Sequence, residues 1–441
     1  MSDLRFLQEL GAEFERISES QAKAHRPDRD RRRGRRIPPR ALSGIGLGLS
    51  LLVVVAVVAV SFGLHGGSPG PSRSVSSPGP SRGVRIVFSA TALNPRSPLG
   101  PAIDRSIEIL RRRLSAFFHD VRVLRAGNGL VVVVPEAKST DQARILALTS
   151  PGRLEFYDWE ANALTPHGKT VASQLQAQDQ TALTISQGSG GVAPGEPGAG
   201  SLSLYQAVML ASRQPPVPTG STLARLGPEY YMFGAPGSAA CAAAAKYNQT
   251  TPIQGKHCPL SGPDTSVQNL DSALPPGVSA SAGQILTVPQ GTVVLQAANP
   301  SASDQVNPTN SSAQFYVLKD NVSLSSQDIT NPRPSTDQAG QPDLQFGFSS
   351  SGASKFQQVT ATIAHRGQNV SLVGQTYNQH FAVALDNQLV TVPQIDFRQY
   401  PDGIIGGGGG GDITGGFTVQ SARNLATQLR LGALPVSLVV R

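Results

Sequence analysis

The apolar, uncharged segment Ala41–Leu64 constrains the fold more than any other feature of the chain. Its 24 residues include no Asp, Glu, Lys, Arg or His. A helix rising about 1.5 Å per residue would cross a lipid bilayer at this length. A helix buried in a protein core is the alternative, which we disfavour because the run has no polar face. We therefore expect Ala41–Leu64 to be a single transmembrane helix.

The basic residues before this segment predict its orientation. Residues 1–40 contain 11 Lys or Arg and 7 Asp or Glu, and 9 of the 11 basic residues fall within 21–40. Positive residues flanking a membrane helix favour the cytoplasmic side. We expect residues 1–40 to be a cytoplasmic basic tail and the C-terminal part to be extracytoplasmic. A nucleic-acid site is the alternative for the basic cluster, but a topology signal that touches anionic lipid is the simpler interpretation.

The composition of the remaining chain excludes some classes of partner. The other 26 of the 37 basic residues are nearly balanced by 22 of the 29 acidic residues. This small excess, spread over about 400 residues, predicts no nucleic-acid partner. The 46 Gly and 34 Pro of the 441-residue chain predict long loops. Residues 65–83 are a Gly/Ser/Pro linker that we expect to separate the membrane helix from a folded domain.

The residues that ordinarily carry catalysis or metal binding form no recognisable pattern. Asp158 and Glu160 flank the only tryptophan at the end of a strand, with no catalytic partner visible in the sequence. The seven His residues lack the spacing of metal ligands. The six glycines at 406–411 lie inside a long connection, so a flexible loop is favoured over a phosphate cradle. We therefore expect no catalytic residue, no metal, no cofactor, no small-molecule substrate and no enzymatic activity.

The two cysteines are Cys241 and Cys258. On the extracytoplasmic side of a membrane, the environment favours a disulfide between them. A metal site with the adjacent His257 and a pair of free thiols are the alternatives. One His and two Cys are fewer ligands than a closed structural zinc site needs.

The folded part divides into two similar units separated by an insertion. We expect the first unit at 84–159, the insertion at 160–341 and the second unit at 342–441. In the first unit the expected elements are a strand at 84–90, a helix at 101–118, strands at 121–124 and 130–134, a helix at 140–149 and a strand at 152–159. In the second unit they are a strand at 344–348, a helix at 352–365, strands at 381–385 and 388–392, a helix at 418–431 and a strand at 436–440.

This order of elements predicts the fold class. The sequence β-α-β-β-α-β is the ferredoxin-like split unit. We therefore expect an α+β protein in which two ferredoxin-like half-domains form a base. The insertion is rich in Ser, Gly and Pro and is expected to be a looser, β-rich subdomain. Its expected elements are a helix at 202–212 and strands at 284–288, 292–296 and 314–318.

Several segments of the chain resemble the SecD family of protein-export subunits. The most specific is Ile413–Leu438, which is similar to the segment I-x-G-x-F-x-x-x-x-A-x-x-L-A-x-x-L-R-x-G-A-L-P-V-x-L that closes the first extracytoplasmic (P1) domain of SecD. The other similar segments are Ala102–Leu114, Leu130–Pro135, Gly152–Phe156, Phe346–Phe356 and Ala382–Pro393. The resemblance covers about 84–159 and 314–438. It implies a P1 base made of both units, with the insertion as the P1 head.

The resemblance also implies what this chain would lack. SecD continues through further membrane helices and works with SecF to pull preproteins outward with the proton gradient. A proton-driven step needs an ionisable group at membrane depth, and Ala41–Leu64 contains none. We therefore expect a SecD P1-like domain on a single anchor in the bacterial inner membrane, without the proton-driven membrane region of SecD.

These patterns lead to one functional hypothesis and one alternative. The first is a non-enzymatic accessory in protein export that binds exported polypeptides or components of the Sec translocon. The alternative is an orphan envelope sensor or structural module that reuses the fold and signals through the cytoplasmic tail. Similarity of fold does not by itself distinguish the two.

Overall fold

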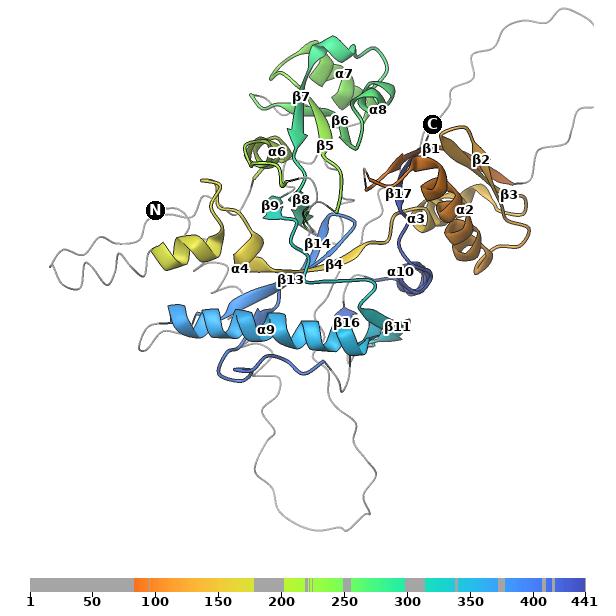
Figure 1. Ribbon diagram of the computed structural model, residues 1–441. Coiled ribbons are helices and arrows are strands. Elements are labelled where there is room, and N and C mark those ends of the chain that lie inside the picture. Colours follow the sequence, from red (N-terminus) through yellow and green to blue (C-terminus); the bar gives the residue numbers. More distant parts are fainter. Residues whose placement is uncertain are drawn as a thin grey trace, which may run out of the picture.

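The computed structural model describes most of the predicted extracytoplasmic part (Figure 1). The described residues are 83–177 apart from 95, 202–248 apart from 219, 220, 222 and 224, 255–297, 314–371 apart from 338 and 339, 377–406, 410–414 and 417–440. The predicted tail 1–40, the predicted membrane helix Ala41–Leu64 and the linker up to residue 82 lie outside them. Of the helices in the described ranges, none is both long enough and apolar enough to cross a membrane.

The first unit supplies three strands of a four-stranded antiparallel sheet, which we call sheet A. Its elements are β1 (Val84–Ala92), α2 (Leu99–Ser115), β2 (Arg122–Ala126), β3 (Gly129–Val134), the 3-10 turn η1 (Ser139–Asp141) and α3 (Gln142–Leu148). Alternate residues of β3 (Leu130, Val132 and Val134) are fully buried beneath the helices. The strand order is β17-β1-β3-β2, and the outer strand β17 (Val436–Val440) comes from the opposite end of the chain.

The expected helices and strands are present with shifted ends, but two self-contained ferredoxin-like half-domains are not confirmed. The last strand of the first unit, β4 (Leu154–Asp158), does not join sheet A. It pairs instead with β13 (Gln379–Leu385) of the second unit, where Phe156 lies opposite Val383. In exchange, β17 of the second unit pairs with β1. All five residues of β4 are buried, so this strand requires cover on both faces, whereas β17 is partly exposed and suits a sheet edge.

The largest sheet, sheet B, lies at the centre of the described structure. Its strand order is β10-β4-β13-β14-β8-β9, and β15 also pairs with β13. The additional strands are β8 (Thr292–Ala297), β9 (Phe315–Lys319), β10 (Leu324–Ser325), β14 (Gln388–Thr391) and β15 (Gln394–Ile395). On one face, α9 (Ser350–Val370) and α10 (Val419–Leu431) cover a core that includes Phe156 and Phe381. On the other face, Tyr157, Trp159 and Ala382 form a second core with residues next to the short helix α4 (Trp159–Asn162).

The first strand of the second unit also leaves its expected sheet. It forms β12 (Pro342–Phe348) in a small sheet of order β11-β12-β16, with β11 (Ile329–Thr336) and β16 (Gly411–Thr414). The glycine tract allows this close pairing. Gly410 has a φ of +72°, and a Cβ there would lie 1.8 Å from the Phe346 carbonyl oxygen. Residues 407–409 of the tract lie outside the described ranges.

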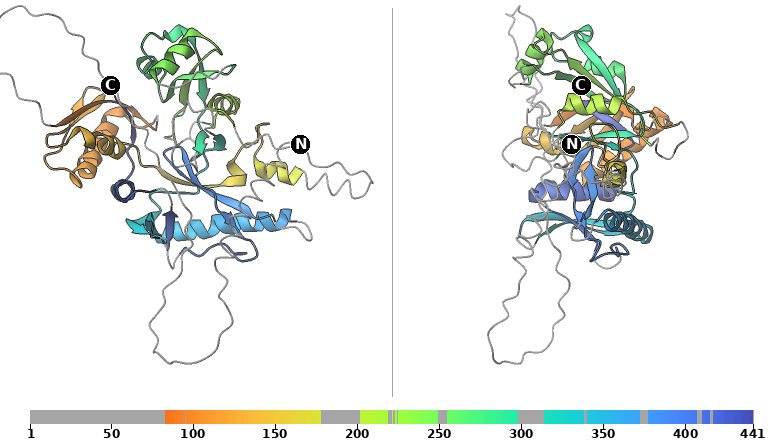
Figure 2. Two further views of the ribbon diagram at one scale, coloured as in Figure 1. Left: turned by 180° about the vertical axis from the view of Figure 1, so that it is seen from behind. Right: turned by 90° about the vertical axis from the view of Figure 1, so that its left-hand side faces the viewer.

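The insertion builds a separate lobe, which we call the distal subdomain (residues 202–288). Its elements are α6 (Leu204–Ser212), β5 (Glu229–Gly234), α7 (Ala239–Tyr247), β6 (Cys258–Asp264), α8 (Val267–Ser272), the 3-10 turn η2 (Ala280–Ala282) and β7 (Gly283–Val288). The strand order is β6-β5-β7. Figure 2 shows this lobe projecting from sheet B on the side opposite α9. The helix α6 contributes Val208 and Ala211 to a core shared with β9.

Candidate functional site: a groove on α9 beside a buried ionic cluster

Two carboxylates that flank the only tryptophan lie at the end of β4. Asp158 caps α4, because its carboxylate accepts a hydrogen bond of 3.2 Å from the Ala161 N–H. Glu160 lies in the first turn of the same helix. Both side chains are almost completely buried, at 6% and 2% exposure. Buried charges are costly unless they are paired, so these two residues require partners.

The partner of Asp158 is Arg366 of α9, more than 200 residues away in the chain. The Arg366 Nη1 donates to Asp158 Oδ2 at 2.8 Å, and Nη2 donates to the other carboxylate oxygen. The Nε of the same guanidinium donates to Gln379. Burial raises the pKa of Asp158, and the hydrogen bonds and charge of Arg366 oppose that rise. This bidentate contact holds α9 against the end of β4.

Glu160 is held by the beginning of β13. Its Oε1 lies 2.6 Å from His380 Nδ1, and its Oε2 accepts from the His380 backbone N–H at 2.9 Å. Arg366 also approaches Glu160, at 3.8 Å. Arg366 contacts both carboxylates and His380 contacts Glu160, so Asp158, Glu160, Arg366 and His380 form one cluster. These contacts hold α9, β4 and β13 together, and we call this group of contacts the clamp.

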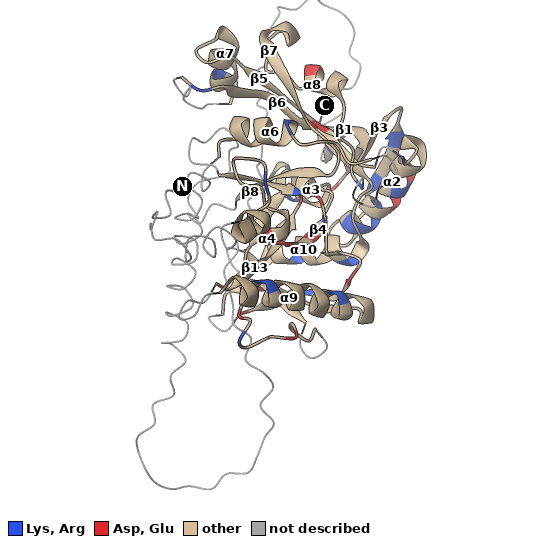
Figure 3. Cartoon of the chain, turned by 60° about the vertical axis from the view of Figure 1, so that its left-hand side comes forward, with Lys and Arg blue, Asp and Glu red and all other residues tan. Residues whose placement is uncertain are grey.

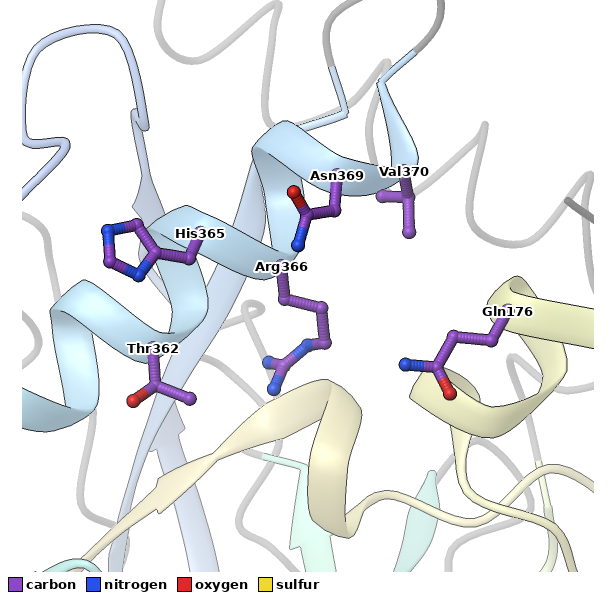
Figure 4. Close-up of a pocket in the computed structure, with 6 residues that line it drawn as sticks. All are labelled: Gln176, Thr362, His365, Arg366, Asn369 and Val370. Atoms are coloured by element: carbon purple, nitrogen blue, oxygen red, sulfur yellow. The ribbon is translucent and has the colours of Figure 1, made fainter.

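A hollow of about 350 Å³, which we call the groove, lies beside this clamp, between α9 and the helical residues 171–177. Figure 4 shows the residues that line it, which are Gln176, Thr362, His365, Arg366, Asn369 and Val370. The amide groups of Gln176 and Asn369 lie on opposite walls. Each amide offers both a donor and an acceptor. The lining can therefore form hydrogen bonds with the backbone of an extended peptide, whatever its sequence.

A second buried ionic cluster joins the distal subdomain to sheet B. Arg225 Nη2 donates to Asp320 Oδ1 at 2.7 Å and to Glu155 Oε1 at 3.1 Å. The Tyr157 hydroxyl donates to the same two carboxylates. Burial raises the pKa of Asp320 to about 6, against the opposing charge of Arg225. Arg225 therefore connects the distal subdomain to both carboxylates.

The same junction contains a second set of contacts. Asn387, in the turn after β13, donates to Glu229 at 3.0 Å and accepts from Arg153 at 2.8 Å. Burial raises the pKa of Glu229, and Arg153 opposes the rise. The first and second units therefore meet the distal subdomain through charged and amide groups.

The cysteines lie away from both clusters, in the distal subdomain. Cys241 of α7 and Cys258 of β6 form a disulfide with an S–S distance of 2.00 Å. His257 stacks on Tyr205, and its Nδ1 lies 3.1 Å from the Gly234 carbonyl oxygen. In the described ranges, no group of three or more His, Cys, Asp and Glu residues is placed to hold a metal ion.

Comparison with known proteins relates part of this chain to a protein-export family. Residues 303–436 match the family model described as SecDF, P1 head subdomain. The matched part of the chain is similar to SecD. Over 126 residues it is 34% identical to the protein translocase subunit SecD of Rickettsia typhi, covering 29% of this chain and 20% of that protein. The SecD of Rhodobacter capsulatus is 32% identical over 151 residues, covering 33% of this chain and 24% of that protein.

The matches have a limited extent. This chain spans 20% and 24% of the length of those two SecD proteins. A solved structure described as a membrane component SecDF that enhances protein export aligns with 81% of this chain and 97% of that chain, at 17% identity and a TM-score of 0.35. The relationship therefore rests on the sequence matches. The matched range includes α9, Arg366 and His380. It lies mainly after 160–341, the insertion that the resemblance implied to be the head.

Proposed function

We propose that this protein is a membrane-anchored, non-enzymatic accessory in protein export. The observation that carries the proposal is the match of residues 303–436 to the SecDF P1 head subdomain. The identity of 34% with a protein translocase subunit over 126 residues supports it. The partners would be exported polypeptides or components of the Sec translocon.

The proposed topology places the described residues outside the cytoplasm of a bacterial cell. Residues 1–40 form the cytoplasmic tail, Ala41–Leu64 forms a single membrane helix and 65–83 forms the linker. The uncharged 24-residue run and the nine basic residues at 21–40 support this orientation. A disulfide between Cys241 and Cys258 suits the oxidising compartment that this topology implies.

The proposed domain organisation modifies the two-unit arrangement. The units 84–159 and 342–441 form one base by exchanging β4 and β17, and 160–341 is inserted between them. Sheet A, with β17 as its fourth strand, has the strand order of a ferredoxin-like sheet. We propose that this sheet is the ferredoxin-like part of the base.

The groove on α9 is the proposed contact for polypeptide. It lies partly within the matched range, and Gln176 and Asn369 present amide groups on both walls. Exported chains differ in sequence, so an accessory that binds many of them must recognise the shared backbone. Side-chain amides meet that requirement, and the clamp of Asp158 and Arg366 keeps one wall in position.

Site-specific photocrosslinking in the full chain tests this proposal. A photoreactive amino acid replaces Gln176 or Asn369 in growing cells, and captured proteins are identified by mass spectrometry. We expect many unrelated secreted precursors, because backbone recognition is independent of sequence. The matched control replaces Arg112 on the exposed side of α2, where we expect no precursor. Capture of one fixed partner that is neither a precursor nor a Sec subunit, or of none at either groove position, would contradict the export role.

A further inference from the structure

Helices cover one face of sheet A, and the other face presents basic and apolar residues. The helix α2 packs on the side where Leu130 and Val132 of β3 are buried. Successive residues of a strand point to opposite faces, so the intervening residues belong to the other face. At the far end of β1, Asn269 of α8 reaches this sheet and donates to Thr91 at 2.8 Å. We call the face opposite α2 the outer face.

The strand register places the outer-face residues in rows across the sheet. Val133 of β3 lies opposite Arg85 of β1 and opposite Arg122 of β2. In the adjacent row, Val131 lies opposite Val87 and Leu124. Directly opposed residues on antiparallel strands share a face. The outer face therefore presents a basic row beside an apolar row.

Both rows are accessible to a partner. Arg85 and Arg122 are exposed, and Leu124 is 55% exposed. Val87 and Val133 are partly exposed, whereas Val131 is nearly buried at the centre of its row. The exposed Leu124 beside the basic row combines apolar area with positive charge on one surface. Figure 3 also shows basic residues on α2, which covers the opposite face of the sheet.

A third cation lies at the same end of the sheet. Arg85 lines a hollow of about 950 Å³ together with Lys138, and one acidic residue, Glu136, also lines it. The charged residues at this end of the sheet include Arg85, Arg122, Lys138 and Glu136, and Asp120 lies two residues before Arg122. Their sum is positive, which favours an anionic partner.

The position of the basic row relative to the linker indicates which anionic partner is available. Arg85 is the second residue of β1, and residue 83 ends the linker. A Gly/Ser-rich chain as long as the proposed linker, residues 65–83, has a root-mean-square end-to-end distance of about 24 Å. The basic row is therefore the part of sheet A that the chain brings nearest to the membrane in which the proposed anchor lies.

We propose that the outer face of sheet A docks on the anionic phospholipid headgroups of the membrane that anchors the chain. The guanidinium groups of Arg85 and Arg122 bind lipid phosphates, and Leu124 enters the interfacial region. This inference rests on the membrane anchor of the proposed function. A second copy of the chain fits less well, because a symmetric contact would bring the arginines of both copies together.

Lipid quenching in the reconstituted full chain tests the docking. An environment-sensitive fluorescent amino acid replaces Leu124, and the protein is inserted into vesicles of phosphatidylcholine with or without phosphatidylglycerol, each with brominated acyl chains. We expect quenching in vesicles that contain phosphatidylglycerol and its loss at high salt, which screens exposed charges. The same probe at Arg112 should remain unquenched in both vesicles.

Matched charge reversals separate this site from general electrostatics. The double variant Arg85→Glu with Arg122→Glu should lower the ratio of docked to undocked protein by more than about fivefold. The loss of one basic residue near an anionic surface already lowers such a ratio about fivefold. Arg105→Glu with Arg112→Glu changes the net charge equally on the exposed side of α2 and should leave the ratio unchanged. Circular dichroism verifies that both double variants are folded.

Each remaining outcome has a defined meaning. If the chain does not float with vesicles, the anchor itself fails and the proposed topology is overturned. If the chain floats but the probe at 124 is unquenched in both vesicles, the docking is wrong while the anchor stands. A probe signal that depends on protein density and is independent of lipid charge would assign the outer face to a second copy and overturn lipid docking.

Discussion

Sheet A and sheet B differ in how many of their faces are covered. In sheet A, β3 places Leu130, Val132 and Val134 beneath α2, and the alternate residues face away. In sheet B, all seven residues of β13 and all five residues of β4 are buried, because helices or other side chains cover both faces. A strand with one covered face, such as β3, shows its buried side in the sequence through alternating residues. A strand with two covered faces, such as β4, requires partners that are distant in the chain.

The two sheets also differ in the groups that pair with their buried charges. Sheet B encloses Glu155, Asp158 and Asp320, which are paired with arginines from the distal subdomain and α9. Beside sheet A, Arg113 is fully buried and donates to neutral backbone carbonyls, which belong to Leu148, Ser150, Pro151 and Gly432. In sheet B the buried charges are therefore paired with opposite charges, which connect the distal subdomain and α9 to the sheet.

The largest expected effect contrasts a buried position in sheet B with an exposed position in sheet A. Ala382→Lys places a charge in a fully buried strand and should lower the free energy of unfolding by more than about 4 kcal/mol or prevent folding. Leu124→Lys on the outer face should change it by less than about 1 kcal/mol. Chemical denaturation of both variants measures the difference, and equal effects would refute the contrast.

Two adjacent arginines of α2 provide the next comparison. Arg113→Leu leaves four carbonyls without this donor and should cost about 3–5 kcal/mol. Arg112 is exposed and pairs with Glu108 on the same helix, so Arg112→Leu should change stability by at most about 1 kcal/mol. Urea unfolding of the two variants checks this. A small effect of Arg113→Leu would mean that water or other donors replace the guanidinium.

The clamp at the groove tests the pairing of charges in sheet B. Arg366→Leu leaves Asp158 buried without its cation and should cost about 3 kcal/mol. Adding Asp158→Asn removes the uncompensated charge while retaining a cap for α4, so the double variant should be more stable than Arg366→Leu. A double-mutant cycle measures the coupling. Additive effects would show that the two side chains contribute independently.

The smallest expected effect is a pH dependence at the junction with the distal subdomain. The pKa of Asp320 is raised from 3.8 to about 6 in the folded protein, so the folded state binds this proton more tightly than the unfolded state does. Its contribution to stability is therefore largest below pH 4 and is lost as the pH rises through 6. Across this range it should amount to about 1–3 kcal/mol.

The variant Asp320→Asn isolates that contribution. The amide retains an oxygen that accepts from Arg225 and Tyr157 but does not titrate. Subtracting its unfolding free energies from those of the unsubstituted protein, between pH 4 and pH 7, should give the slope assigned to Asp320. Parallel pH profiles for the two proteins would assign the titration to another group.

Some of the buried charges could have been found from the sequence pattern. In α9, Phe356, Val359 and Ile363 face inward, and Arg366 continues the same stripe at helical spacing. In α2, Arg113 continues the stripe of Ser106 and Ile109 in the same way. A lone arginine on a buried stripe predicts a buried partner. The partner's identity could not be predicted, because Asp158 is 208 residues away from Arg366.

The sequence by itself determined the local elements of this protein and the side of each one-faced strand that is buried. Hydrophobic periodicity, turn glycines and helix caps act over a few residues, so they are visible without a structure. Only the tertiary structure decided that β4 and β17 exchange partners, that Arg366 meets Asp158 and that α9 borders a groove. Periodicity indicates that a face is buried, but the surface that covers it depends on how distant segments pack together and satisfy each other's charges.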